Sequence, residues 1–319
     1  GMTGIYFNPL SNKAYTETDL LLSVGSRHEE FTSGGWSYFP ANARFVQIDV
    51  DASEIGRNFL PTTALIADAK LALAAIAAEV RGRGVDQALV SKRKQALAEA
   101  KRTYIAEVAE EVQTEQMPIR TKRVVWELNQ VFGENTILVN ENGGQDLWSY
   151  YYPYYQIKEG SAAVVPAEQT CMGLGVVGAV AAKLNHPEKN VVCVTGDAAF
   201  QMYTQDLPTA VQYKTPVTWV VLNNNALGWP KLTARARGEK YVAVDFEAQP
   251  NFVQLAQAYG CHGEHVENPA GIHGALERAL EANKNGTPAV VEFFVETWSY
   301  SWGFRDYYKR TRELPAGVE

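Results

Sequence analysis

The chain has 319 residues, of which 46% are hydrophobic and 20% charged, and its formal net charge is −7. This apolar content excludes an intrinsically disordered chain, and the length suggests about two domains. The acidic balance argues against a general nucleic-acid binder, because phosphate contact needs clustered Lys and Arg. No apolar stretch approaches the roughly 20 residues of a membrane span, and no secretory signal opens the chain. We therefore expect neither nucleic acid nor membrane as a partner.

The three cysteines, Cys171, Cys193 and Cys261, are widely spaced along the chain. Such spacing is typical neither of a disulfide framework nor of a zinc site. Free cysteines fit a reducing compartment, so we expect a cytoplasmic protein.

Residues 1–80 have the pattern of a small α/β unit. A helix near Ser11–Thr18 precedes two apolar strands, at 20–25 and 45–50, and a helix over 68–80 closes the unit. Residues 81–117 are rich in Lys, Arg, Glu and Ala without strand signals, which predicts a helical connector. Its acidic cluster, Glu107–Glu111, is expected to be an exposed helix face.

Residues 118–297 return to an α/β pattern in which near-continuous apolar strands alternate with helices. Strands are expected at 136–140, 161–165, 190–195, 217–222 and 289–295, and helices at 121–131, 173–184, 204–213, 253–259 and 271–284. This alternation predicts a parallel sheet with helices on both faces. In such sheets, ligands bind beyond the carboxyl ends of the strands.

Two of these strands end in oxygen-bearing side chains, Asp197 and Asn224. A carboxylate and an amide oxygen suit Mg²⁺, which completes its coordination with phosphate oxygens and water. Gly196 would permit a tight turn, and Ala198 and Ala199 are small enough for their N–H groups to approach an anion. The alternative is that Asp197 caps a helix and that the asparagines form a turn.

The same residues carry a resemblance to a known family. Gly196-Asp197, followed on the next strand by Leu222-Asn223-Asn224, resembles the diphosphate-binding signature of thiamine diphosphate enzymes. The segments 168–175, 200–213 and 226–229 are similar to the acetolactate synthase branch. The resemblance runs through most of residues 118–295, so it is more specific than the short motif.

The resemblance implies roles for individual residues. Asp197 and Asn224 would hold Mg²⁺ with the backbone carbonyl of Ala226, while Gln145 and the N–H groups of the Ala198-Ala199 pair would meet the diphosphate. The remaining expected cofactor contacts are Thr170, Gly196, Leu227 and Gly228. Family members usually have Gly where this chain has Ala198; its N–H group is retained if φ stays negative.

Met172 occupies the position whose bulky side chain, in the family, wedges between the two rings of the cofactor and imposes a V shape on it. That shape brings the 4′-imino nitrogen to the reactive carbon, an orientation effect. Without the resemblance, Met172 would be interpreted as a core methionine.

The first 80 residues resemble the second half of the central domain of the same family, a Rossmann-like unit that in relatives holds FAD, ADP or nothing. The resemblance places the nucleotide contacts at Arg27, Asp49 and Asp51. After that arginine, acetolactate synthases usually have two acidic residues and an arginine, where this chain has His28-Glu-Glu-Phe. Residues 298–319 are expected to form a tail or lid, in which Arg305, Lys309 and Arg310 could receive an anionic substrate or a CoA phosphate. The alternative is a tail packed on a subunit interface.

The resemblance also implies a partner. The pyrimidine-binding domain, with its catalytic glutamate, has no counterpart in this sequence. We therefore expect a second polypeptide to carry it, in a hetero-oligomer with at least two copies of each chain, or this chain to be a fragment of a longer one. The enzyme would make or break a C–C bond next to a carbonyl in a 2-oxo acid or an acyl-CoA. Decarboxylase, carboligase and 2-hydroxyacyl-CoA lyase remain open.

Two alternatives compete with this interpretation. Gly173, Gly175 and Gly178 match the dinucleotide fingerprint GxGxxG, which would indicate an NAD(P)-dependent oxidoreductase. Residues 166–172 separate the preceding strand from the first glycine, however, so we expect these glycines to let a helix pack closely on the sheet. The other alternative is a non-catalytic subunit with a vestigial thiamine diphosphate site.

Overall fold

The computed structural model describes residues 2–166 and 169–311. It divides into two compact units, residues 2–107 with Trp302–Thr311, and residues 108–301. The division falls inside helix α3 (Gln87–Glu111), in the segment expected to be a helical connector. None of the helices in these described ranges has the length and apolar surface needed to cross a bilayer.

The first unit is built on three parallel strands in the order β1-β2-β3. These are β1 (Leu20–Val24), β2 (Arg44–Asp49) and β3 (Thr63–Ile66), accompanied by α1 (Pro9–Thr16), α2 (Ala69–Arg83) and α11 (Trp302–Thr311). Helix α1 begins after Asn8, whose side chain accepts a hydrogen bond from Ser11 N at 2.8 Å in a capping box. Strand β3, four residues long, was not predicted from the sequence.

Strand β3 and helix α2 leave much apolar surface uncovered within this unit. Every residue of β3 is exposed, and α2 has no buried residue. The exposed fractions reach 64% for Ile66 and 71% for Leu71. Exposed apolar surface concentrated on one strand and the next helix is typical of a face that another polypeptide covers.

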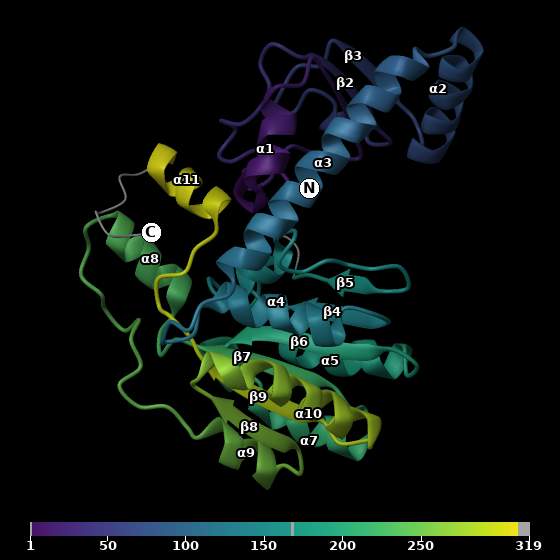
Figure 1. Ribbon diagram of the computed structural model, residues 1–319. Helices are drawn as coiled ribbons and strands as arrows, with labels where there is room; N and C mark the ends of the chain where they lie inside the picture. The colour runs from purple at the N-terminus through teal and green to yellow at the C-terminus, as the bar shows by residue number, and fades with distance from the viewer. Residues whose placement is uncertain (1, 167–168, 312–319) are drawn as a thin grey trace. The chain divides into compact units, whose positions relative to one another are not determined.

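The second unit contains, among its described residues, six parallel strands in the order β5-β4-β6-β7-β9-β8. The strands are β4 (Thr136–Asn140), β5 (Ala162–Val164), β6 (Asn190–Gly196), β7 (Thr218–Asn223), β8 (His262–Val266) and β9 (Ala289–Phe294). The helices are α4 (Thr121–Phe132), α5 (Leu174–Asn185), α6 (Asp197–Met202), α7 (Leu207–Gln212), α8 (Gly228–Ala236), α9 (Phe252–Ala258) and α10 (Ile272–Lys284). A parallel sheet with helices on both sides confirms the predicted fold class (Figure 1).

Alternation along the strands assigns side chains to the two faces of this sheet. Val139, Cys193 and Trp219 point to one face, where they share a buried cluster with apolar residues of α5, α7 and α9. Helices α4 and α10 pack against each other, and α10 contacts β7, β8 and β9. Both faces are therefore buried, which is why the strands have near-continuous apolar sequences.

Some elements differ from the sequence-based expectation. The helix expected over 204–213 begins as a 3-10 turn, and α7 starts only at Leu207 because Pro208 fits the first turn of a helix. Strand β8 was missed because its residues, His262–Val266, are mostly polar or glycine, as an edge strand permits. Helix α8 was also missed, whereas α6 begins where Ala198 and Ala199 were expected to start a helix.

The glycines of α5 set how closely this helix packs on the sheet. A Cβ added to Gly175 would lie 3.0 Å from Asn140 O and 3.1 Å from Cys193 Sγ. A Cβ on Gly178 would meet its nearest neighbour, Val139 Cγ1, only at 3.5 Å. Close helix–sheet packing therefore requires Gly175 but not Gly178.

We predict that Gly175→Ala lowers the free energy of unfolding by about 1–3 kcal/mol, because the added methyl overpacks the contact with β4 and β6. Gly178→Ala, the matched control in the same helix, should be neutral or stabilising by up to about 1 kcal/mol, since alanine is the better helix former. Urea unfolding of both variants measures the difference. Equal effects would contradict the packing interpretation.

Candidate cofactor and metal site

Asp197 and Asn224 follow the ends of two neighbouring strands. Strands β6 and β7 pair in parallel, with Gly196 opposite Leu222, so both side chains lie at the same edge of the sheet. Their exposed fractions are only 1% and 5%. The structure thus places the two predicted side-chain metal ligands at adjoining strand ends, both buried.

Burial raises the pKa of Asp197 to about 6. Its Oδ1 accepts a hydrogen bond from Ala198 N at 3.0 Å, and its Oδ2 accepts one from Gln249 Nε2 at 2.6 Å. These bonds oppose the rise in pKa without cancelling it, and no positive charge among the described residues contributes. The Asp197 carboxylate is therefore a buried anion without a counter-charge.

The Asn224 amide is buried and only partly satisfied. Its Oδ1 accepts one hydrogen bond, from Ala226 N at 3.2 Å, and its Nδ2 has no partner. A Cβ on Gly228 would lie 3.2 Å from that Nδ2, so glycine keeps space beside the amide. Asn225 adopts a left-handed φ of 54°, which asparagine tolerates.

A neighbouring segment holds this loop in place. Leu227 N donates to Val244 O at 2.7 Å, and Phe246 N donates to Asn225 O at 2.9 Å. The same segment contributes Gln249, whose Oε1 is buried without a partner. Sequence reasoning missed Gln249, because it lies between α8 and α9 in an irregular stretch with no motif.

The backbone before and after Asp197 differs in one respect from the expectation. Gly196 has an ordinary extended φ of −80°, and a Cβ there would meet nothing within 4 Å, so the expected tight turn is absent. Ala198 and Ala199 lie in the first turn of α6 and do not have positive φ. The methyl of Ala198 therefore leaves its N–H group in place.

Gln145 is engaged on both sides of its amide. Its Oε1 accepts from Thr121 Oγ1 at 2.7 Å, and its Nε2 donates to Thr297 O at 3.0 Å. Its neighbour Gly144 lies close to the first turn of α8, the helix that follows β7, since a Cβ on Gly144 would be 3.4 Å from Trp229 N. Loops that follow β4, β7 and β9 thus meet at the edge that carries Asp197, while a contact of Gln145 with a diphosphate stays a prediction.

Glu141 occupies the N-terminus of α5. Its Oε1 accepts from Gly173 N and its Oε2 from Gly175 N, each at 2.9 Å. Burial raises the pKa of Glu141, and these hydrogen bonds oppose that rise. A carboxylate of the chain itself therefore takes the place where a dinucleotide phosphate would bind. Since β5 also ends at Val164 and α5 begins only at Leu174, the geometry argues against the NAD(P) alternative.

The expected nucleotide contacts of the first unit have local partners. Asp49 Oδ1 accepts from Asp51 N at 3.0 Å, and Asp51 Oδ1 accepts from Ser53 N at 2.8 Å. His28 lies near Ser23, with Nε2 and Oγ 2.8 Å apart, and Arg27 O accepts from Asn58 Nδ2. FAD or ADP binding here stays a prediction.

The expected C-terminal lid is divided between the two units. Tyr300 OH donates to Gly228 O at 3.1 Å, and Trp148 Nε1 donates to Ser299 Oγ at 2.9 Å, so residues 299–300 line the site edge. Helix α11 packs in the first unit, where Asp306 accepts a hydrogen bond from Tyr38 OH. The side chains of Lys309 and Arg310, like residues 312–319 and Glu168, lie outside the described part.

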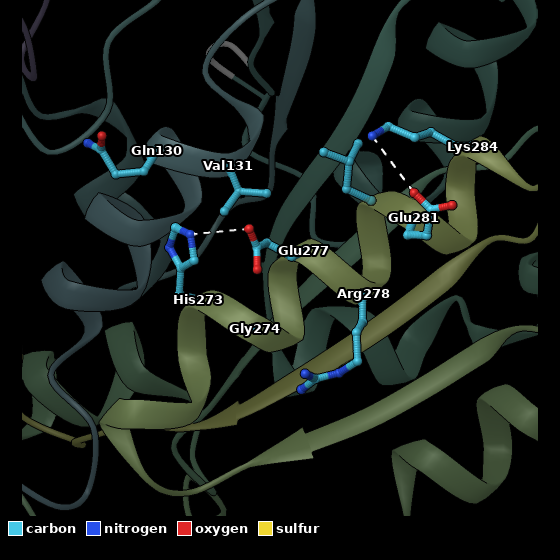
Figure 2. A pocket seen from close by; sticks show the side chains of 9 residues that line it. Gln130, Val131, His273, Gly274, Glu277, Arg278, Glu281 and Lys284 are labelled. Atoms are coloured by element: carbon cyan, nitrogen blue, oxygen red, sulfur yellow. Dashed lines mark ion pairs between the residues drawn. The ribbon is translucent and has the colours of Figure 1, made fainter.

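A surface groove of about 540 Å³ lies between α4 and α10, away from these residues (Figure 2). Its charged side chains are largely paired. His273 Nδ1 lies 2.9 Å from Glu127 Oε2, and Figure 2 also marks the ion pairs His273–Glu277 and Lys284–Glu281. Because its lining includes none of the predicted site residues, this groove is not the predicted cofactor site.

Comparison with known proteins identifies the family of this chain. Residues 142–293 match the family model of the C-terminal TPP-binding domain of thiamine pyrophosphate enzymes, and residues 1–76 match the central domain of the same enzymes. The chain belongs to this family, whose cofactor is also called thiamine diphosphate. The matched range 142–293 contains Asp197, Asn224 and Ala226.

Several relatives within the thiamine pyrophosphate enzymes are acetolactate synthase large subunits. The probable large subunit of Methanococcus aeolicus is 27% identical over 93% of this chain, and that of Methanocaldococcus jannaschii is 29% identical over 89%. The large subunit of Lactococcus lactis is 30% identical over 88%. The chain spans about half the length of these relatives, 50%, 48% and 47% respectively.

The donor set fits the metal that accompanies this cofactor. Mg²⁺ takes one or two protein carboxylates together with phosphate oxygens and water. Among the described residues, no group of three His, Cys, Asp or Glu could hold a metal ion, so an all-side-chain cage is not the arrangement here. One uncompensated carboxylate, Asp197, and one partly satisfied amide, Asn224, match a site completed by a diphosphate.

We predict that Asp197→Asn stabilises the unloaded chain at pH 7. The rise of the pKa from 3.8 to about 6 means that the folded state binds this proton more tightly than the unfolded state, so the free energy of unfolding falls as pH rises from about 4 to 6. The neutral asparagine amide cannot ionise, so the variant keeps the free energy of unfolding that wild type loses over this pH range, about 1–3 kcal/mol. Urea unfolding at pH 4 and pH 7 measures it, with Asp206→Asn as a control. Equal stability of variant and wild type at pH 7 would contradict the prediction.

Proposed function

We propose that the second unit binds Mg²⁺ and the diphosphate of thiamine diphosphate. Asp197, Asn224 and the carbonyl of Ala226 would hold the metal, while Gln145 and the N–H groups of Ala198-Ala199 would meet the diphosphate. Thr170, Gly196, Leu227 and Gly228 would line the cofactor. The observation that carries this proposal is the Asp197 carboxylate, buried without a counter-charge at the end of β6 beside the Asn224 amide at the end of β7.

The reaction we propose makes or breaks a C–C bond next to a carbonyl. Bound thiamine diphosphate supplies carbanion chemistry toward a carbonyl carbon. The chain would hold the metal, orient the two rings with Met172, and line the site edge with residues 299–300. A 2-oxo acid substrate is favoured by the similarity to acetolactate synthase large subunits, while an acyl-CoA lyase is the second candidate. Proton transfer to the pyrimidine ring would need a glutamate supplied by another domain.

That domain would be contributed by polypeptide outside this sequence, in an assembly with at least two copies of each part. Two observations support this proposal. The chain spans about half the length of its relatives. In addition, β3 and α2 expose apolar side chains such as Ile66 and Leu71, a surface that a further domain or subunit can bury.

Calorimetric titration tests the cofactor site. We expect the chain to bind thiamine diphosphate only with Mg²⁺, and Asp197→Ala and Asn224→Ala to weaken binding by more than about 10-fold, because each removes a metal ligand. Asp206→Ala, a carboxylate removed elsewhere in the same unit, should bind like wild type. Binding of NAD(P) without any thiamine diphosphate effect would instead favour the oxidoreductase alternative. Unchanged activity of the assembled enzyme with Asp197→Ala would favour the vestigial one.

Isolation of the assembly from its native source tests the partner proposal. We expect it to contain a pyrimidine-binding domain, and Ile66→Lys with Leu71→Lys to reduce the assembled mass in light scattering, since both place charges on the apolar surface. Tyr213→Lys, at an exposed apolar position of the other unit, is the control. Full assembly of the double variant would contradict a role of β3 and α2 in it.

A further inference from the structure

The loop before α5 is held in a strained conformation around Met172. Thr170 has a φ of 42°, and Gly173 has a φ of 93°. Glycine adopts left-handed backbone freely, but a β-branched residue such as threonine does so rarely. Strain of this kind persists only where the surrounding structure imposes it. Something must therefore hold the loop on each side of residues 171–172.

Two adjacent side chains at the end of β4 supply that hold. Asn142 Nδ2 donates to Thr170 O at 2.5 Å, before Met172. The Glu141 carboxylate accepts from Gly173 N and Gly175 N, both at 2.9 Å, after it. Asn142 N donates back to Glu141 Oε1 at 2.9 Å, so the two clamp residues are also tied to each other.

The opposite side of the loop leaves it little freedom. A Cβ on Gly173 would lie 1.8 Å from Tyr203 Cε2, so the Tyr203 ring closes the space beside Gly173. Glu141 is 1% exposed, and its negative charge lies at the N-terminus of α5, where a helix favours an anion. The hydrogen bonds between the Glu141 carboxylate and the backbone at Gly173 are thus buried, while the Met172 side chain is half-buried.

We propose that Glu141 and Asn142 are positioning residues that fix Met172 against the cofactor rings; we call them the Glu141–Asn142 clamp. This inference rests on the proposed function, since it assigns to the clamp the orientation of the side chain that would support the cofactor's shape. It gives the clamp no contact with the diphosphate or the metal. Loss of the clamp should therefore weaken binding of the rings but not of the diphosphate end.

The test compares two probes on the full chain, thiamine diphosphate and inorganic pyrophosphate, each titrated with Mg²⁺. We expect Asn142→Ala to weaken thiamine diphosphate at least about 10-fold, in the range seen when outer positioning contacts are removed, and to leave pyrophosphate affinity unchanged. The control is Asn268→Ala, which removes another asparagine-to-backbone contact, between Asn268 Oδ1 and Ala270 N. It should change neither affinity.

A second measurement distinguishes positioning from general damage. Hydrogen exchange of the free chain gives a readout without ligand: amides over 170–175 should exchange faster in Asn142→Ala and not in Asn268→Ala.

The outcomes separate the two proposals. Wild type that binds neither probe refutes the proposed function. The clamp proposal is refuted, and the proposed function is not, if Asn142→Ala binds thiamine diphosphate like wild type. The same holds if Asn142→Ala loses affinity for both probes equally. Unchanged hydrogen exchange over 170–175 in Asn142→Ala also refutes it, whether or not a ligand binds.

Discussion

The Asp197 carboxylate is the constraint around which the second unit is organised. It lies at the end of β6 without a positive partner among the described residues, and burial raises its pKa to about 6. A buried carboxylate of this kind costs folding free energy unless a cation neutralises it. The chain therefore keeps a local instability that a bound metal would relieve, as expected where stability is given up for a binding site.

The parallel sheet explains why this carboxylate can be buried and still meet a ligand. All strands of the second unit run the same way, so the loops after β4, β7 and β9 gather at the edge that carries Asp197. Gly144 and Tyr300 approach the first turn of α8, so backbone and aromatic groups pack at that edge. These contacts supply no counter-charge to Asp197.

The sequence predicted the parts of this arrangement that leave a local pattern. Apolar strands ending in Asp197 and Asn224 placed both residues correctly, because strand ends are fixed by periodicity. Gln249 and the partners of Gln145 could not be predicted, since they depend on side chains that meet across distant segments. Strand β8 was missed for a related reason: an edge strand is paired on one side only, and its mostly polar sequence carries no apolar signal.

The role of the glycine motif at the start of α5 depends on which anion its backbone N–H groups bind. A helix N-terminus with close-packed glycines attracts an anion in any fold, because its N–H groups are unpaired there. In a dinucleotide site the anion is a phosphate; here Glu141 fills the position from the end of β4. Since an internal carboxylate has already paired those groups, the motif fixes a loop of the chain. Under the proposed function, the diphosphate would therefore bind elsewhere on the same edge, with a metal ion beside the uncompensated Asp197 carboxylate.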